Sequence, residues 1–286
     1  MDKTLSVTGG SVRLGDIVAI ARDAGAAIMQ IYTGDEAEWE TKTKTDASPL
    51  TAADLTANAL ICERLGALDP AFPIMSEENK QLDFDARAGW TYYWCVDPLD
   101  GTKEFLKRNG EFTVNIALMR NAPAAGGDDA PHGAARPVLG VVYAPATGVA
   151  YFAASGVGAH VAPAPDGAAE APLAAASFKE SDAGLTLVCS RSHMDDRTAA
   201  FVASYTDAAT ASMGSSLKFM LIAEGKAHVY PRLAPTMEWD TAASQVVVEE
   251  AGGSVVREDT GKPVGYNKRD LLNPFFIARG RVQKEA

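Results

Sequence analysis

The stretch that constrains this chain most is residues 94–105, where an apolar run ends in closely spaced acids. Residues 92–96 are aromatic or β-branched, apart from one cysteine, which predicts a buried strand. Pro98 has no backbone N–H and a fixed φ, so we expect strand pairing to stop there and the chain to turn. Asp97 and Asp100 are then presented three residues apart on a tight bend.

Two acids on such a bend have a functional and a structural interpretation. Carboxylates that hold a hard cation, next to N–H groups that hold an anion, are the parts of a metal-dependent phosphate site. The N–H groups are expected at Gly101 and Thr102, where a helix could open. Alternatively, Asp97 and Asp100 are ordinary turn formers. Their position directly after an apolar strand favours a site, because α/β proteins tend to place sites there.

The composition is that of a globular chain with excess negative charge. The 286 residues suffice for one large or two modest domains. A net charge of −11 argues against nucleic-acid binding, which needs a basic surface. The separated cysteines Cys62, Cys95 and Cys189 fit neither a zinc site nor a disulfide framework, which predicts a reducing compartment. With no signal pattern and no apolar run of membrane-spanning length, we expect a cytoplasmic protein, with peripheral membrane association left open.

The first part of the chain predicts two helices. Residues 11–33 show apolar side chains at helical spacing, with Ser11 as the expected N-cap. The polar residues 41–49 are expected to form a loop of the kind that covers active sites. Thr51 then caps a second helix, whose first turn contains Asp54. The helix dipole favours a carboxylate there, so capping alone would explain Asp54.

Strands dominate the middle of the chain. Residues 73–78 predict a short strand that ends in Glu77 and Glu78, and its end is expected to converge with that of the strand before Asp97. Antiparallel strands are predicted over three further segments, residues 112–119, 138–143 and 149–152. Two stretches rich in alanine and proline are expected to be loops, residues 121–137 and 162–176.

After residue 182, strands and helices alternate. Strands are predicted over residues 185–189 and 227–230, the second closed by Pro231 and Arg232. Helices are predicted over residues 217–224 and from Trp239, with Asp240 at the start of the latter. This order implies a layered α/β lobe over residues 182–286, distinct from an α+β lobe over residues 1–181.

Four of these elements, in this order, resemble the lithium-sensitive, magnesium-dependent phosphatases of the inositol monophosphatase superfamily. They are Asp54 behind residues 48–51, Glu77 within 76–78, residues 97–102, and residues 239–243. The resemblance covers essentially the whole chain apart from the two alanine- and proline-rich loops. It implies the αβαβα sugar-phosphatase fold, with a metal site at the junction of the lobes.

Within that superfamily the chain is most similar to bacterial 3′(2′),5′-bisphosphate nucleotidases. The similar stretches are residues 100–105, 107–115, 190–193, 214–219 and 230–232. This similarity implies hydrolysis of adenosine 3′,5′-bisphosphate to AMP and phosphate, and possible acceptance of 3′-phosphoadenylyl sulfate, in sulfur metabolism. The alternatives are an inositol monophosphatase or broad sugar phosphatase on the same site, or a non-catalytic nucleotide or metal sensor. No nucleic-acid partner is implied, and a monomer and a homodimer both remain open.

The resemblance also implies roles for individual residues. Two or three Mg²⁺ ions would be held by four carboxylates and one carbonyl, from Glu77, Asp97, Leu99, Asp100 and Asp240. Asp54 and Thr102 would be catalytic, with the Thr102 hydroxyl handling the proton of a metal-activated water. The nucleotide would contact a second set, Gly101, Thr102, His193, Ser215, Lys218, Arg232 and Asp240. The second phosphate needs a cation beyond the metals, which Lys218 or Arg232 could supply. The structural alternatives are a snorkelling Lys218 and a turn histidine at His193.

Overall fold

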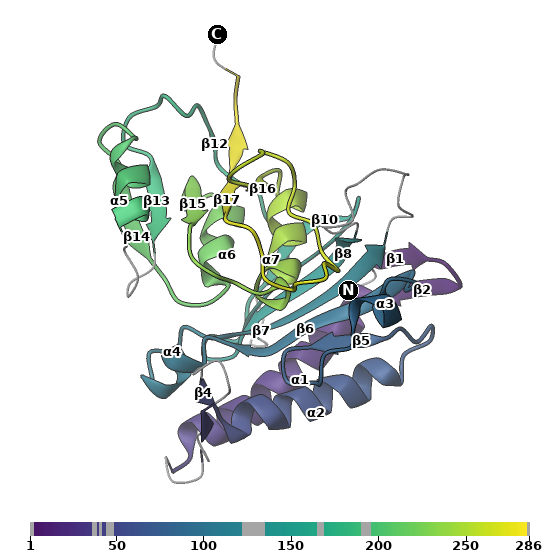
Figure 1. Cartoon of the computed structure of the whole chain (residues 1–286). Helices are drawn as coiled ribbons and strands as arrows, with labels where there is room; N and C mark the ends of the chain where they lie inside the picture. The colour runs from purple at the N-terminus through teal and green to yellow at the C-terminus, as the bar shows by residue number, and fades with distance from the viewer. Residues whose placement is uncertain are drawn as a thin grey trace.

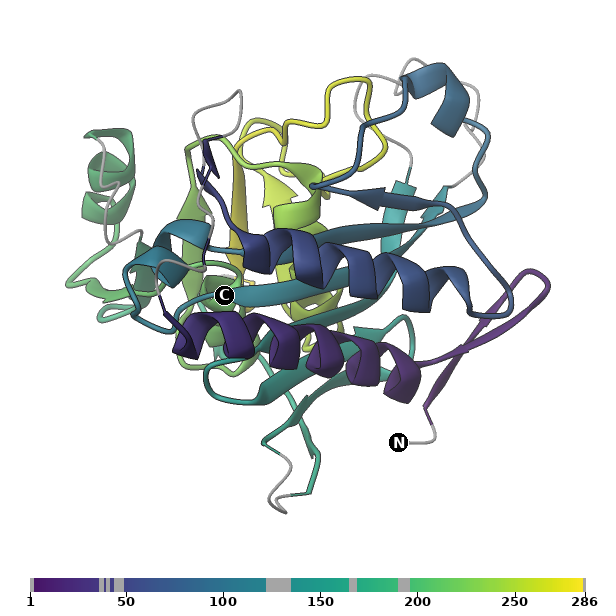
Figure 2. The same cartoon turned by 90° about the horizontal axis from the view of Figure 1, so that it is seen from below.

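Five alternating layers of helix and sheet make up the computed structural model (Figure 1). The structure describes residues 3–35, 39, 42–43, 49–121, 135–164, 169–189 and 196–284. The first layer pairs α1 (Leu14–Thr33) with α2 (Ala52–Gly66), which lie side by side under a seven-stranded sheet (Figure 2). Helices α6 (Leu217–Ala223) and α7 (Glu238–Glu250) separate that sheet from a five-stranded sheet, and α5 (Asp196–Ala203) lies beyond it. The predicted αβαβα architecture is confirmed.

The seven-stranded sheet has the strand order β11-β10-β9-β8-β7-β6-β5 and is antiparallel except for the β5–β6 pair. Its strands are β5 (Ile74–Ser76), β6 (Tyr92–Asp100), β7 (Thr113–Asn121), β8 (Ala135–Ala144), β9 (Val149–Ala154), β10 (Gly158–Ala162) and β11 (Ala171–Pro172). The predicted antiparallel strands are therefore confirmed, and they are longer than expected. Asn121 and residues 135–137 belong to strands rather than to the predicted loop, whose centre lies outside the described residues. Within 162–176, β11 likewise replaces part of the expected loop.

The five-stranded sheet has the order β14-β13-β15-β17-β16. Its strands are β13 (Thr186–Cys189), β14 (Ala209–Ser212), β15 (Val229–Arg232), β16 (Ser254–Arg257) and β17 (Phe276–Arg279). Pro231 does not close β15 as predicted, because the antiparallel pairing with β17 runs on through Arg232. The short elements are α3 (Phe84–Arg87), α4 (Thr102–Leu106), β3 (Lys42–Thr43) paired with β4 (Pro49–Leu50), and β12 (Ser177–Phe178) paired with β18 (Arg281–Val282).

The predicted start of the first helix is wrong by three residues. Residues Gly10–Arg13 form β2, which pairs with β1 (Thr4–Val7) in an antiparallel hairpin. Gly9 adopts a φ of 91° in the turn, a conformation that glycine tolerates best. Ser11 therefore pairs with Ser6 instead of capping a helix, and α1 begins at Leu14 behind Arg13. The loop predicted over 41–49 has paired strand residues at both ends, and residues 44–48 lie outside the described part.

Strand β6 does not end at Pro98. Asp97 pairs with Asn115 and Asp100 pairs with Thr113, with a register shift between the two pairs. Pro98 lies inside this bulge, where its missing N–H costs no ladder hydrogen bond. The bulge turns Asp97 and Asp100 without ending the strand, which is how bulges commonly re-aim side chains next to active sites.

Alternate side chains of β6 lie in two different hydrophobic cores. Trp94 packs in the core toward α1 and α2, whereas Tyr93 packs in the core toward α7. The second core also contains Val247 of α7 and Phe276 of β17, so both halves of the sequence contribute to it. The lobe division at residue 182 stays a prediction. Among the helices that the structure describes, none combines the length and the apolar character that a bilayer crossing requires.

Candidate active site

Three acids from distant parts of the sequence meet at one edge of the seven-stranded sheet. Strands β5 and β6 are parallel, so their carboxyl ends lie together, and the Glu77 N–H donates to the Val96 carbonyl at 3.1 Å. Asp240 lies in the first turn of α7. One carboxylate oxygen from each of Glu77, Asp97 and Asp240 lies within 4.8 Å of the other two. The predicted convergence of the two strand ends is confirmed.

The electrostatics of this cluster favour a bound cation. Asp97 is only 1% exposed, and burial, reinforced by Glu77, Asp100 and Asp240, raises its pKa well above the usual range. Burial and the neighbouring Asp100 also raise the pKa of Asp240, although the Met237 N–H donates to it at 2.8 Å. A hard divalent cation would relieve this repulsion, and carboxylate oxygens are the donors it prefers. The residues present therefore fit such a metal.

Leu99 and Asp100, the other two predicted ligands, lie on the β6 bulge. The Leu99 N–H donates to Asp97 Oδ1 at 3.0 Å, which helps to fix the Asp97 side chain. The Asp100 carboxylate accepts a hydrogen bond from the Ser216 hydroxyl at 2.8 Å and lines a cavity together with Asp240. Asp100 is not one of the three clustered acids, but its charge acts on both Asp97 and Asp240.

Asp54 makes both of the contacts that the sequence presented as alternatives. Its Oδ2 accepts from the Thr51 N–H at 2.7 Å and from the Thr51 hydroxyl at 2.6 Å, completing a capping box at the start of α2. Its Oδ1 accepts from the Thr102 hydroxyl at 3.3 Å. Because Thr51 holds one oxygen, the other is aimed at Thr102, which opens α4.

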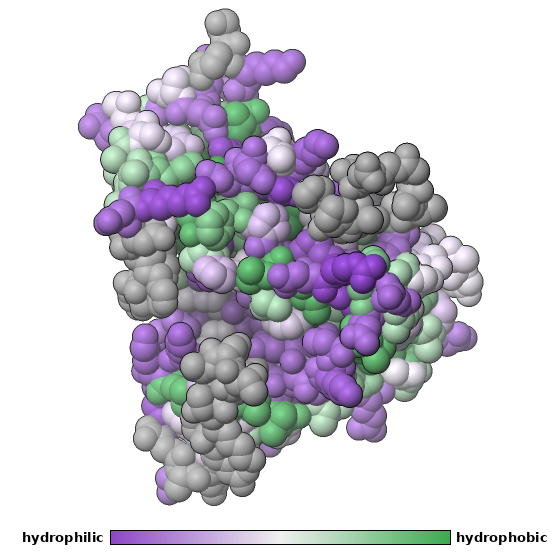
Figure 3. All heavy atoms as spheres, in the orientation of Figure 1, coloured by the Kyte–Doolittle hydropathy of each residue, from purple (hydrophilic) through white to green (hydrophobic). Residues whose placement is uncertain are grey.

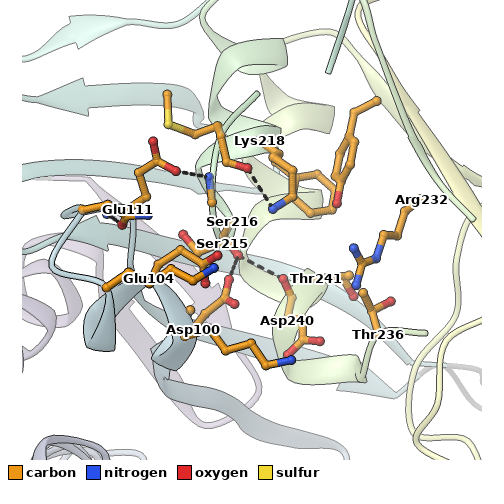
Figure 4. A pocket seen from close by; sticks show the side chains of 18 residues that line it. Asp100, Glu104, Glu111, Ser215, Ser216, Lys218, Arg232, Thr236, Asp240 and Thr241 are labelled. Carbon is orange, nitrogen blue, oxygen red and sulfur yellow. Dashed lines mark hydrogen bonds between the residues drawn. The ribbon is translucent and has the colours of Figure 1, made fainter. Parts of the chain in front are cut away.

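A cavity of about 400 Å³ lies beside the acids, between α4, α6 and β15 (Figure 4). On the face drawn in Figure 3, hydrophilic residues predominate inside the hollow and toward its lower right. Lys218 of α6 lines the cavity although it is only 8% exposed, and burial lowers its pKa to about 8. Its Nζ donates weakly to the Met213 carbonyl at 3.4 Å. Arg232 enters from β15 and donates from Nη2 to the Pro235 carbonyl at 2.8 Å.

Gly101 and Ser215 lie against each other in the lining of this cavity. Gly101 has a φ of 94°, and a Cβ there would lie 3.1 Å from the Ser215 Cβ and from the Glu111 carbonyl. Ser215 has a φ of 44°, unusual for a residue other than glycine. Such strained backbone is common where a loop is held against a site. His193, the remaining predicted nucleotide contact, lies outside the described residues.

Three further residues contribute to the site, and the sequence alone indicates no role for them although they fall within the family-like stretches. Glu111 accepts a hydrogen bond from the Gly214 N–H at 2.8 Å, which ties the chain after α4 to the loop before α6. Asn115 and Ser216 form a buried pair next to Asp100. Each of these contacts joins residues that are more than a hundred positions apart in the sequence or that lie on neighbouring strands. The local spacing of residues therefore does not indicate them.

Comparison with known proteins extends over nearly the whole chain. A model of the inositol monophosphatase family matches residues 13–285. The 3′(2′),5′-bisphosphate nucleotidase CysQ of Salmonella typhimurium is 43% identical over 267 residues, which are 92% of this chain and 98% of the relative. The protein of the same name from Buchnera aphidicola is 40% identical over 279 residues, 93% and 92% of the two chains.

A solved structure agrees with these matches. CysQ from Bacteroides thetaiotaomicron, a bacterial member of the inositol monophosphatase family, superposes with a TM-score of 0.77 at 39% identity, over 94% of this chain and 98% of that one. The family is metal-dependent, in keeping with the acidic cluster at the edge of the sheet. The chain belongs to the inositol monophosphatase family.

Proposed function

We propose that this protein is a divalent-cation-dependent 3′(2′),5′-bisphosphate nucleotidase that hydrolyses adenosine 3′,5′-bisphosphate to AMP and phosphate. Relatives that carry the name of this activity are 43% identical over nearly their entire length, which supports the substrate class. The observation that carries the proposal is the buried Lys218 in the cavity next to the acids. A bisphosphate substrate has a second phosphate that needs a cation of this kind. We include 3′-phosphoadenylyl sulfate as a further substrate, and with it a role in sulfur metabolism.

The acidic cluster would hold the metal. Glu77, Asp97 and Asp240 supply clustered carboxylate oxygens, and Asp100 and the Leu99 carbonyl would complete the set. We propose Mg²⁺, in two or three positions, because these oxygen donors suit a hard ion. Bound divalent cations would supply Lewis acidity toward the phosphoryl oxygens and would lower the pKa of a coordinated water.

The protein's own proton-handling groups would be Thr102 and Asp54. An attacking water that lies against Thr102 Oγ1 can give its proton to that oxygen, while the hydroxyl proton passes to Asp54 Oδ1 at 3.3 Å. The water oxygen then joins phosphorus, the bond to the ribose 3′ oxygen breaks, and that oxygen takes up a proton from a solvent water molecule. No covalent enzyme intermediate is needed, because phosphoryl transfer is catalysed mainly by positioning and charge.

The second phosphate would lie between Lys218 and Arg232. Both side chains line the cavity, and Arg232 Nε is buried without a hydrogen-bond partner among the described residues. An anion would satisfy that donor and would favour the charged form of Lys218 against the burial that lowers its pKa. Gly101, Ser215 and Asp240 would contact the ribose side of the nucleotide.

Lys218→Met tests this assignment, because it removes the charge and keeps an apolar side chain. The rate constant kcat/KM is measured for adenosine 3′,5′-bisphosphate and for adenosine 3′-monophosphate, which lacks the second phosphate. We expect the preference for the bisphosphate to fall about 10- to 100-fold, the size of a charge-assisted hydrogen bond. Lys226→Met, at a position paired with Glu224, is the control and should leave the preference intact. An unchanged preference in Lys218→Met would remove Lys218 from the phosphate site.

A further inference from the structure

One buried hydroxyl joins three elements of the active site. Ser216 is 1% exposed, and its Oγ lies 2.8 Å from Asp100 Oδ2 and 3.0 Å from the backbone carbonyl of Asp240 (Figure 4). Asp100 ends β6, Asp240 lies in the first turn of α7, and Ser216 immediately precedes α6. The hydroxyl thus contacts two residues proposed as metal ligands, which belong to different elements.

Helix capping does not account for this serine. Serine is among the preferred residues at a helix N-cap because its side chain can accept a backbone N–H. Ser216 occupies that position in α6, yet its side chain makes no capping hydrogen bond and its backbone is in the right-handed helical region. The hydroxyl is directed toward Asp100 instead.

Asn115 determines the direction of the hydrogen bonds. Its Nδ2 lies 2.8 Å from Ser216 Oγ and 3.4 Å from Asp100 Oδ2, and the residue is 1% exposed. An ionised carboxylate only accepts hydrogen bonds, so the Asn115 atom beside Asp100 must be the amide nitrogen. The amide therefore donates to Ser216, and the single hydroxyl proton remains for Asp100 or for the Asp240 carbonyl. Asp100 is the closer and the charged acceptor.

We propose that Ser216, oriented by Asn115, is a positioning residue that sets the Asp100 carboxylate and the first turn of α7 for metal binding. The proposal rests on the proposed function, since it assumes that these acids bind a divalent cation. Partners that hold a ligating carboxylate typically change metal affinity by about 10- to 100-fold when removed. The hydroxyl also links the seven-stranded sheet to α6 and α7, so one residue holds proposed ligands from two elements.

Binding of Mn²⁺ alone to the metal-free protein tests the proposal without an activity assay. Free Mn²⁺ is counted by electron paramagnetic resonance during titration of the wild type, Ser216→Ala and Asn115→Ala. We expect both variants to bind Mn²⁺ about 10- to 100-fold more weakly than the wild type. Ser216→Cys keeps a weak donor of similar size and should fall between the wild type and Ser216→Ala. Ser216→Cys also takes the place of Ser216→Ala in the titration if the alanine variant fails to fold.

Ser244→Ala is the matched control. Ser244 is a fully buried serine of α7 whose hydroxyl has no hydrogen-bond partner among the described residues. Its removal should leave Mn²⁺ binding at the wild-type value. If wild type and Ser216→Ala bind Mn²⁺ equally, the positioning role is wrong while the proposed function stands. If the wild type binds no Mn²⁺, the metal-dependent function itself fails.

Discussion

At the residue scale, a single carboxylate can serve two purposes when its oxygens are assigned to different partners. Thr51 donates to Oδ2 of Asp54 through both its N–H and its hydroxyl, and Oδ1 accepts from the Thr102 hydroxyl. The helix cap thereby acts as the support that orients the proposed base. From the sequence, capping and catalysis looked like competing explanations of Asp54, because spacing cannot distinguish the two oxygens of one side chain.

Thr102→Ala should lower kcat by about 100-fold or more, because it removes the hydroxyl proposed to relay the proton. Nucleotide binding should change little, since the Thr102 hydroxyl contacts Asp54 and the Leu99 carbonyl rather than Lys218 or Arg232. Steady-state kinetics and nucleotide titration separate the two effects. Thr102→Ser retains the hydroxyl and is the control that should keep most of the activity. A change confined to KM in Thr102→Ala would contradict the proposed role.

Asp97→Asn should raise the stability of the metal-free protein and lower its enzymatic activity. The substitution removes a buried charge that Glu77, Asp100 and Asp240 all disfavour, so the metal-free protein should unfold at higher temperature. Turnover should fall at least about 100-fold, because the metal loses a ligand charge. Calorimetry in a chelator and a phosphate-release assay with Mg²⁺ measure the two quantities. Asp85→Asn, at an exposed position, should change neither; near-normal turnover in Asp97→Asn would refute the metal assignment.

At the element scale, the placement of α7 decides where Asp240 lies. The helix packs on β8 at Gly140, where a Cβ would come within 2.4 Å of the Ala243 carbonyl and 2.5 Å of Val246 Cγ1. Only a residue without a side chain allows this approach. Glu238 fixes the start of the helix, because it is fully buried and pairs with the Lys268 ammonium.

Gly140→Ala should therefore push α7 away from the sheet. We expect a loss of about 1–3 kcal/mol in the free energy of unfolding, typical of overpacking, together with weaker Mn²⁺ binding as Asp240 moves. Urea unfolding and the Mn²⁺ titration report these effects. Gly66→Ala, where the added Cβ meets nothing within 4 Å, is the control and should be neutral or slightly stabilising. Equal stability of the two variants would show that α7 can adjust without cost.

The sequence predicted an element correctly where neighbouring residues determine it, and incorrectly where a contact with a distant segment determines it. Short apolar runs predicted the strands of the large sheet, and Thr51 predicted the start of α2, because both signals are local. Ser11 was misassigned because the pairing of β1 with β2 overrides its capping preference. Pro98 was read as a strand end because the sequence does not show that a bulge absorbs its missing N–H.

The same distinction between local signals and distant contacts applies to the residues of the site. The acids of the metal cluster were predicted from the order of family-like elements, and the structure brings three of them together. The contacts of Ser216, Asn115 and Glu111 were not predicted, since each depends on how α6 and its preceding loop dock against the first sheet. Docking of layers leaves no periodic signal in the sequence.

At the scale of the whole molecule, the site concentrates negative charge from several elements where the strand ends of the seven-stranded sheet meet α7. Burial raises the pKa of Asp97 and of Asp240 in the folded protein. Between the unfolded value near 4 and these raised values, the folded state binds more protons than the unfolded state, so stability without metal falls as the pH rises. A divalent cation replaces those protons, and its binding therefore strengthens with pH.

Stabilisation by Mg²⁺ should consequently be larger at pH 8 than at pH 5.5. Thermal unfolding is followed at both pH values with chelator and with saturating Mg²⁺, and the increase in Tm caused by Mg²⁺ is compared. The Asp97→Asn variant should show a weaker dependence on pH, because one of the displaced protons is missing. An increase in Tm that is larger at pH 5.5 would contradict the assigned direction of the shifts.

Phosphate release from adenosine 3′,5′-bisphosphate and from inositol 1-phosphate, measured side by side with Mg²⁺ and with a chelator, tests the proposed activity of this protein. We expect rapid, Mg²⁺-dependent release from the nucleotide and a much lower kcat/KM for the inositol ester. Preference for the inositol ester would keep the metal site but overturn the role of Lys218 and Arg232. Absence of release from both substrates would contradict the proposed phosphatase activity altogether.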